Sequence, residues 1–489
     1  MHLVLPSYTV FAFIAEWLIR IVMLFVVPHN RKPASATAWL VIIMLFPTIG
    51  LLIFLLIGSP KLPKRRRNLQ ATMDRIITKS VKKAAKNSEL AKYIYPASIN
   101  SRIEPFVKLN ANLGSFPAFN GNKVELYSDY YGTFGSIIKD INKAKKFVHI
   151  EYYALALDDQ TEPVFDALAK AIKRGIKVRV LFDSYGSRKY PHYRKMKRKL
   201  TAIGAEWHKL LPLGIPFKTF TRPDLRNHRK IVVIDGQIGY TGSQNLIMQN
   251  YHRHDELFYQ ELVVKVQGPI VLQLDAAFMT DWYSETKVLL DVNSLPEANI
   301  DTSVKGKTLA QLLPSGPGYE NDNNLKLFNG LIHAAKKRIV ITNPYFVPDG
   351  SLMVAITSAA QRGVEVIMIN SEVMDQALVG HAQRSYYEEL LKSGVNIYWY
   401  EKPILLHSKH ITIDDDIAVI GSSNLDMRSF QLNLEVTLVC YDEQIVKSLD
   451  KIQSKYLEQS KLLALKKWQS RPLRSKMLDD LARLTAALQ

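Results

Sequence analysis

A short polar motif that occurs twice constrains this chain more than any other feature. The motif has the form His-x-Lys-x4-Asp, and its two copies comprise His228, Lys230, Asp235, His407, Lys409 and Asp414. A glycine turn of the form Gly-Ser-x-Asn follows each copy, at 242–245 and at 421–424. Two such copies are very improbable by chance, so we interpret them as equivalent points in two halves of a duplicated unit.

The segments around the two motifs repeat a larger pattern. A β-forming run at 147–155 is followed by a helix and a second run ending at 184, and the runs at 338–349 and 360–372 repeat this order. Strand, helix, glycine and buried strand in succession indicate an α/β fold with crossover helices and a mostly parallel sheet. We therefore predict a first half over 119–290 and a second half over 291–443. Residues 444–489 are predicted to form amphipathic helix that packs on the second half, with membrane contact as the alternative.

Each motif supplies half of a phosphoryl-transfer site. The histidine and the lysine are two residues apart, so on a strand their side chains point to the same face. Two halves packed about a pseudo-twofold axis would bring two imidazoles and two ammonium groups to one phosphate. One imidazole could then attack phosphorus while the other protonates the leaving alkoxide and later activates a second hydroxyl. This chemistry requires no metal and no other cofactor, and the alternative is a purely structural repeat.

Further site residues follow from the matched positions. The side chains expected at the phosphate, besides the lysines, are Ser243, Asn245, Ser422 and Asn424. A carboxylate within an apolar strand is costly unless it is paired, so Glu261 is predicted to orient His228, and Glu435 to orient His407. The two motif aspartates end their strands, and closing the turn is a better role for them than proton transfer. The unmatched histidines His252, His254 and His381 are assigned to the surface or to packing.

The amino-terminal part is strongly apolar and then strongly basic. Residues 36–57 and 8–27 are each long enough, at about 1.5 Å per residue, to cross a hydrocarbon layer of about 30 Å. We therefore predict a transmembrane helical hairpin over 1–60, with a secretory signal peptide as the alternative. The formal net charge is +19, and a basic linker at 61–118 should lie against acidic lipid or be solvated. The positive-inside rule places the remainder in the cytoplasm.

Two further segments are candidates for substrate contact. The stretch 211–224 extends the first half relative to the second and is predicted to be a loop at the mouth of the site or a tolerated surface insertion. The basic cluster at 188–199 could guide an anionic substrate or simply be an exposed helix face. Cys440 is the single cysteine, which excludes an internal disulfide and suits a reducing compartment.

The paired motifs with their Gly-Ser-x-Asn turns resemble the phospholipase D superfamily. The blocks RNHRKIVVIDG, NPYFVPD and HAQRSYYEELL and the apolar amino terminus are similar to bacterial cardiolipin synthases over nearly the whole chain. The resemblance implies two pseudo-twofold-related phospholipase D-like halves with mixed, mostly parallel sheets flanked by helices. Many members carry a tryptophan near the strand of Glu261, where this chain has Tyr259 and Gln260.

The resemblance also implies an activity. It is the transfer of a phosphatidyl group between two phosphatidylglycerol molecules at the cell membrane, giving cardiolipin and glycerol through a phosphohistidine. His228 would be the nucleophile and His407 the acid and base, although the symmetry leaves the reverse assignment open. The alternatives are phospholipid hydrolysis, a nucleic-acid phosphodiesterase and a noncatalytic lipid-binding scaffold. The expected partners are anionic phospholipid and the membrane surface, without nucleic acid, and the oligomeric state stays open.

Overall fold

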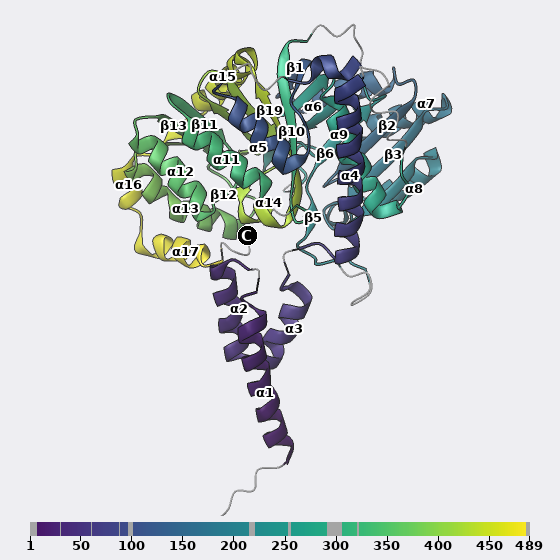
Figure 1. Ribbon diagram of the computed structural model, residues 1–489. Coiled ribbons are helices and arrows are strands. Elements are labelled where there is room, and N and C mark those ends of the chain that lie inside the picture. Colours follow the sequence, from purple (N-terminus) through teal and green to yellow (C-terminus); the bar gives the residue numbers. More distant parts are fainter. Residues whose placement is uncertain are drawn as a thin grey trace, which may run out of the picture. The chain divides into compact units, whose positions relative to one another are not determined.

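The computed structural model describes residues 7–29, 31–59, 61–87, 89–95, 101–214, 221–252, 256–290, 306–319 and 322–485. The chain divides into two compact units, residues 1–62 and 63–489 (Figure 1). The predicted boundary between the two halves, at 290–291, borders a stretch that lies outside the described residues.

The first unit consists of the three helices α1 (Ser7–Val26), α2 (Pro33–Leu45) and α3 (Pro47–Ile57). Met23, Val27 and Ile43 are buried where α1 meets α2. Within α1, Arg20 Nη2 lies 3.4 Å from Glu16 Oε2, one helical turn away.

The predicted membrane-spanning hairpin is not found. Within the described part of 1–62, no helix has both the length and the apolar character needed to cross a membrane. The run 36–57, predicted to be one span, is divided at Phe46 into α2 and α3, which have 13 and 11 residues. Pro47 explains the break, because proline disfavours helical backbone in the residue before it and has no N–H to donate.

The second unit is built on one long sheet of mirrored halves. The strands of the first half are β1 (Phe119–Tyr127), β2 (Phe147–Tyr152), β3 (Lys177–Asp183), β4 (Glu206–Leu210), β6 (Lys230–Ile234), β7 (Ile238–Gly242) and β9 (Val263–Gln267). Those of the second are β10 (Thr308–Ser315), β11 (Arg338–Thr342), β13 (Glu365–Ser371), β14 (Asn396–Tyr400), β16 (His410–Ile413), β17 (Ile417–Gly421) and β19 (Asn433–Tyr441). The sheet order β4-β3-β2-β6-β7-β9-β1-β10-β19-β17-β16-β11-β13-β14-β20 reads the same outward from the β1–β10 pair, with β20 (Ser460–Leu462) added at one edge.

The sheet is mixed, as predicted, but the expectation that it is mostly parallel is wrong. Only the crossover strands β2–β3–β4 and β11–β13–β14 run parallel among these main strands. From β2 through to β11 every neighbouring pair is antiparallel. A tight return after each motif strand accounts for the antiparallel pairs β6–β7 and β16–β17. After the first motif strand this return contains Asp235-Gly236, a dipeptide that is a strong hairpin signal.

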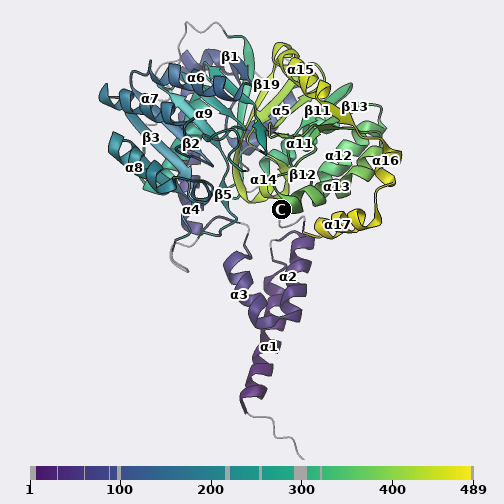
Figure 2. The same cartoon turned by 180° about the vertical axis from the view of Figure 1, so that it is seen from behind.

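Helices cover both faces of this sheet (Figures 1 and 2). On β6, Val232 and Ile234 pack in one core with α6 (Tyr130–Ile141), α7 (Glu162–Lys173) and α8 (Tyr193–Ile203). Ile231 and Val233 point to the opposite face, toward α9 (Val271–Thr286). In the second half, α11 (Asn323–Ala334), α12 (Gly350–Gln361) and α13 (Ala377–Lys392) cover one face, and α15 (Glu443–Glu458) lies on the other.

The basic segment after the first unit is not a free linker. Its helix α4 (Lys64–Asn87) buries Met73 and Ile77 in the core that contains α9, and Arg66 pairs with Glu285 at 2.6 Å. After the short helix η1 (Glu89–Tyr93), α5 (Glu104–Gly114) buries Phe106 in the core of the second half. The described residues of 63–118 therefore pack on the sheet unit, and the basic side chains of α4 other than Arg66 and Arg67 are exposed on its outer face.

Candidate active site

Each motif strand ends in a turn held by its aspartate. Asp235 and Asp414 adopt left-handed backbone, with φ of 56° and 50°. The carboxylate of Asp235 accepts three backbone N–H groups, from Lys145, Lys146 and Phe147, at 2.7–2.9 Å. That of Asp414 accepts the equivalent three groups, from Lys336, Lys337 and Arg338. Both aspartates thus anchor the motif hairpin to the start of a neighbouring strand, in agreement with the predicted turn-closing role.

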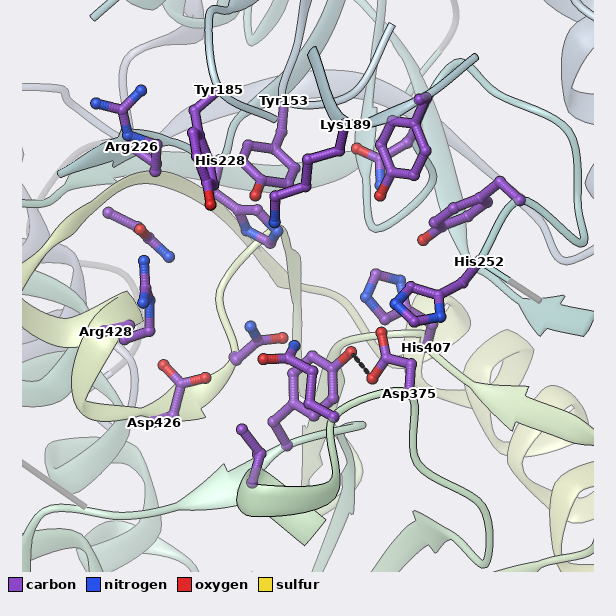
Figure 3. Close-up of a pocket in the computed structure, with 18 of the residues that line it drawn as sticks. Tyr153, Tyr185, Lys189, Arg226, His228, His252, Asp375, His407, Asp426 and Arg428 are labelled. Carbon is purple, nitrogen blue, oxygen red and sulfur yellow. Dashed lines mark hydrogen bonds between the residues drawn. The ribbon is translucent and has the colours of Figure 1, made fainter. Parts of the chain in front are cut away.

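A short strand precedes each motif histidine and pairs with a strand of the other half. In β5 (Arg226–Asn227), Asn227 pairs in parallel with Leu434 of β19, and His228 N donates to Leu434 O at 2.8 Å. In the mirrored arrangement β15 (Ile404–Leu406) pairs with β8 (Phe258–Gln260), and His407 N donates to Gln260 O at 2.8 Å. As a result the two imidazoles line one cavity between the halves (Figure 3).

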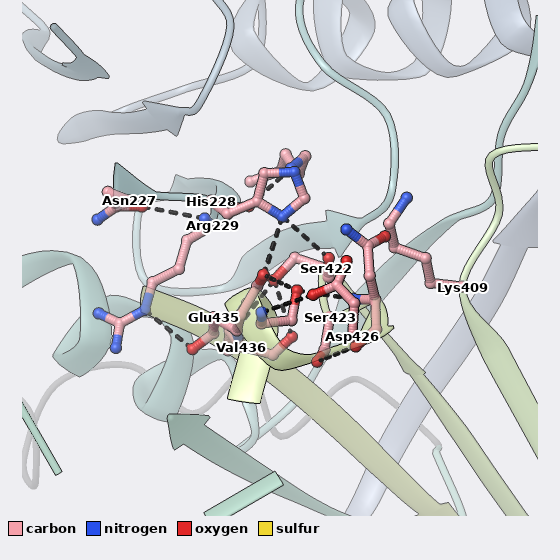
Figure 4. Close-up of polar contacts among 12 residues, drawn as sticks. Asn227, His228, Arg229, Lys409, Ser422, Ser423, Asp426, Glu435 and Val436 are labelled. Carbon is pink, nitrogen blue, oxygen red and sulfur yellow. Dashed lines mark hydrogen bonds and ion pairs between the residues drawn. The ribbon is translucent and has the colours of Figure 1, made fainter. Parts of the chain in front are cut away.

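The glutamates are exchanged between the halves, which corrects the pairing predicted from the sequence. His228 Nδ1 lies 3.0 Å from Glu435 Oε1, and His407 Nδ1 lies 2.7 Å from Glu261 Oε1 (Figure 4 shows the first pair). The prediction paired each histidine with the glutamate of its own half because the two are nearer in sequence. The parallel pairing of β5 with β19 and of β15 with β8 places each histidine beside the residue that precedes the other half's glutamate.

The electrostatics make both imidazoles neutral and both glutamates ionised near pH 7. Burial lowers the pKa of His228 to about 4 and outweighs the opposite effect of Glu435, and burial likewise lowers the pKa of His407. Burial alone would raise the pKa of Glu261 and of Glu435, but the adjacent histidine and lysines hold it below the usual value. An ionised carboxylate only accepts, so Nδ1 of each ring carries the proton and Nε2 keeps a free lone pair.

The lysines lie directly behind the histidines. Lys230 Nζ donates to His228 O at 2.6 Å, and Lys409 Nζ donates to His407 O at 2.7 Å. Burial lowers the pKa of Lys230 to about 7 and that of Lys409 to about 8. An anion bound nearby would therefore raise the pKa of both lysines and favour their charged form.

The two asparagines and the two serines differ in position. Asn245 and Asn424 line the cavity, as the phosphate-binding prediction requires. The serines lie behind the glutamates instead. The Ser422 hydroxyl donates to Glu435 and accepts Val436 N–H at 3.0 Å, and the Ser243 hydroxyl accepts Leu262 N–H at 3.0 Å. Each hydroxyl thus binds the backbone of the residue that follows a glutamate, and neither serine lines the cavity.

The cavity has a volume of about 510 Å³, within the usual range for ligand sites. The sequence reasoning missed most of its other walls, which include Tyr153, Tyr185, Tyr190, Arg226, Tyr251, His252, Tyr345, Asp375, Gln376, Asp426, Arg428 and Asn433. Tyr153 and Tyr345 could have been found, since each follows the first crossover strand of its half in the sequence. In the structure each ring packs edge-on against a motif histidine, at 5.0 and 6.0 Å between ring centres. For Arg226 and Arg428 the indication in the sequence is weaker, because each lies only a few residues from a motif or from its Gly-Ser-x-Asn turn.

The remaining candidates fall on different parts of the unit. His252 is exposed and lies at the cavity, whereas His381 packs against the carboxyl-terminal helix through Asp479 at 2.8 Å. His254 and residues 215–220 of the predicted insertion lie outside the described residues. Of the basic cluster 188–199, Lys189 lines the cavity.

This geometry defines a class of protein: an α/β phosphoryl-transfer enzyme in which two mirrored phospholipase D-like halves complete one site. The family described as "Cardiolipin synthase, PLD-like domain" matches residues 137–282 and 329–456, and the family described as "Phospholipase_D-nuclease N-terminal" matches 17–59. The chain is 34% identical to cardiolipin synthase A of Proteus mirabilis, over 97% of this chain and 98% of that protein. It is 33% identical to cardiolipin synthase 1 of Staphylococcus epidermidis, over 99% and 98%.

The chain therefore belongs to the cardiolipin synthase family of phospholipase D-like enzymes. The crystal structure of phosphatidylserine synthase from Haemophilus influenzae supports the same fold, with a TM-score of 0.60 and 15% identity over 80% of this chain and 100% of that chain.

Proposed function

We propose that this enzyme makes cardiolipin and glycerol from two molecules of phosphatidylglycerol through a phosphohistidine intermediate. The observation that carries the proposal is the pair of imidazoles in one cavity, each held by a glutamate of the opposite half. A double displacement needs two such groups, one to form the covalent bond and one to move protons. The curated relatives named above, matched over nearly their full length, are cardiolipin synthases.

In the first step, Nε2 of one histidine attacks phosphorus and the bond to the glycerol oxygen breaks. The bound phosphate anion favours the protonated form of the other imidazole, which gives its proton to the departing glycerol. By the family resemblance His228 is the nucleophile and His407 the acid. The ionised glutamates stabilise the positive charge that forms on each ring.

In the second step, the now neutral His407 takes a proton from a hydroxyl of the second phosphatidylglycerol. That oxygen attacks phosphorus, the bond to His228 breaks, and cardiolipin leaves with both histidines restored. Lys230, Lys409, Asn245 and Asn424 stabilise the negative charge on the phosphoryl oxygens during both displacements. His407 performs the proton transfers, and the lysines and asparagines stabilise the charge, so the proposal invokes no metal and no cofactor.

The proposed substrate is a membrane lipid, so we infer that the reaction takes place at the cell membrane. Two features support contact with anionic lipid: the amino-terminal family match at 17–59, and the exposed basic side chains on the outer face of α4. Basic residues held near an anionic leaflet contribute about 1 kcal/mol each.

Product analysis tests this function directly. Purified enzyme in phosphatidylglycerol vesicles should yield cardiolipin and glycerol in equal amounts, measured by mass spectrometry. Phosphatidic acid without cardiolipin would instead identify a hydrolase. Cleavage of DNA without any lipid product would identify a nucleic-acid phosphodiesterase.

A further inference from the structure

The carboxyl-terminal helix α17 (Leu473–Arg483) packs with its polar face inward. Asp479 is buried, and its carboxylate binds His381 Nδ1 of α13 and the Arg471 guanidinium, both at 2.8 Å. On the same face, Arg483 lies over the ring of Tyr386. Within α17, all of which the structure describes, Ala482 is the one apolar side chain that is buried, in the core of the second half. The helix is therefore held there by this small contact, by ion pairs and by a cation–π contact.

The opposite face of α17 exposes large apolar side chains. They comprise Leu473, Met477, Leu478, Leu481 and the following Leu484, with exposed fractions of 53–80%. Four of them recur at intervals of three and four residues and so form one stripe along the helix. A surface helix ordinarily buries its apolar stripe and exposes its polar one, so this orientation is the reverse of what folding alone favours. Single exposed apolar residues need no explanation, whereas a contiguous stripe indicates a contact surface.

The surroundings of the stripe are basic. Between Lys461 and Leu484 the sequence has seven lysines and arginines against two aspartates, one of which is the buried Asp479. Lys466, Lys467 and Arg474 are exposed. An exposed apolar stripe bordered by cations is the pattern of a helix that lies in the interface of an anionic bilayer.

The stripe is also linked to the cavity. α13, on which α17 packs, begins directly after Asp375 and Gln376, and its Val379 lines the cavity. Leu378, which precedes Val379, is 52% exposed. The cavity wall and the support of α17 are thus parts of one helix.

We propose that α17 is an interfacial membrane helix that inserts Leu473, Met477, Leu478, Leu481 and Leu484 into the headgroup boundary of an anionic bilayer. The choice of lipid as the occupant rests partly on the proposed function, since a phospholipid-consuming enzyme must draw its substrates from a bilayer. By this contact α17 positions α13, and with it the cavity, at the lipid surface.

A site-specific dye tests the contact in the full-length protein. The native Cys440 is buried and burial raises the pKa of its thiol, so a cysteine introduced by Leu481→Cys reacts selectively. Val354→Cys on α12 is the matched control, because Val354 is 59% exposed and Leu481 is 58% exposed. On addition of phosphatidylglycerol-containing vesicles, the dye at 481 should shift to shorter wavelength and become about tenfold less accessible to an aqueous quencher. The dye at 354 should not change.

Three results would overturn the proposal. The first is no change at position 481, or an equal change at both positions. The second is protection of position 481 that rises with protein concentration without vesicles, which would identify a second copy of the chain as the occupant. The third is protection at every concentration without vesicles, which would identify the residue 1–62 unit.

Turnover gives an independent measurement. The double variant Leu478→Gln/Leu481→Gln should lose about tenfold in rate on phosphatidylglycerol vesicles and match the wild type on monomeric short-chain phosphatidylglycerol. Val354→Gln should match the wild type on both. An unchanged rate on vesicles, or an equal loss on both substrates, contradicts the proposal. A wild-type protein that makes no cardiolipin contradicts the proposed function alone, because the dye reports lipid contact without catalysis.

Discussion

The two halves of the sheet unit agree at the centre of the cavity and differ at its ends. At the centre, each half contributes one histidine and one asparagine to the lining, backed by one lysine and one glutamate in mirrored positions. Two residues before the motif histidine, however, the first half has the cavity residue Arg226, and the second has Leu405 in the core. Four residues after the asparagine, the second half has the cavity residue Arg428 where the first has Gln249.

The loops after β3 and β13 extend this difference. The first carries Lys189 and the second carries Asp375, which accepts the hydroxyls of Tyr345 and Tyr259 at 2.7 and 3.1 Å. Figure 3 shows Arg226 and Arg428 on the side of His228, and Asp375 and His252 next to His407. A matched centre suits a reaction whose two displacements are chemically alike, and unlike ends allow the two phospholipids to be told apart.

Loss of either central imidazole should have the largest effect. We expect His228→Ala and His407→Ala each to lower kcat by about 10³-fold or more, because both displacements need both rings. The measurement is cardiolipin formation from phosphatidylglycerol vesicles. His333→Ala, which removes an exposed histidine on α11, is the control and should retain wild-type turnover. Substantial activity in either motif variant contradicts the shared site.

The exchange of glutamates between halves gives the second prediction. Glu435→Gln and Glu261→Gln should each lower kcat by about 10- to 100-fold, because each histidine loses the carboxylate that orients it. Double-mutant cycles on the free energy of unfolding, using His228→Asn, locate the partner. Coupling of about 1 kcal/mol should appear between positions 228 and 435 and be absent between 228 and 261. The reverse pattern would restore the pairing within each half.

The unlike ends of the cavity predict a smaller, selective effect. Within the part of the chain that the structure describes, neither Lys189 nor Arg428 forms an ion pair with a carboxylate. Burial and repulsion from Arg428 lower the pKa of Lys189, as expected where cations converge. The double variant Lys189→Gln/Arg428→Gln should lower cardiolipin formation about tenfold relative to exchange of labelled glycerol into phosphatidylglycerol. Arg188→Gln, an exposed neighbour, is the matched control. Equal losses in both reactions would show that the basic end does not recognise a second phosphate.

The smallest expected effect is on the pH profile of kcat/KM. Lys230 and Lys409 act in their charged form, and their pKa values of about 7 and about 8 imply that activity falls as pH rises through this range. His228 acts in its neutral form, and its pKa of about 4 implies that activity falls only as pH drops through about 4. Rates on vesicles between pH 4 and pH 10 should therefore be highest below about pH 7. A rate that rises steadily through pH 8 contradicts this assignment.

The sequence predicted the local features well and the long-range ones poorly. The motif residues, the duplication and the crossover strands β2–β3 and β11–β13 depend on local patterns, and the structure contains them. The glutamate exchange depends on β5 pairing with β19 across more than 200 residues, which no local pattern encodes. The antiparallel centre was missed although Asp235-Gly236 signalled a hairpin. The break at Pro47 was missed because the apolar run was judged by its length alone.

The side chains at the cavity ends were missed for a related reason. Arg226, Arg428 and Asp375 have no matched counterpart in the repeat, so a search for symmetry passes over them. The lesson is that the repeat identifies the shared chemistry, while its departures from symmetry mark the residues that distinguish the substrates.

Identification of the covalent intermediate tests the central claim most directly. The enzyme is denatured at alkaline pH during turnover on phosphatidylglycerol vesicles, and its peptides are mapped by mass spectrometry. We expect a phosphatidyl group on His228 in the wild type and none at that position in His228→Asn. Cardiolipin formation without a modified motif histidine, or with the group on a residue outside the cavity, would contradict this expectation.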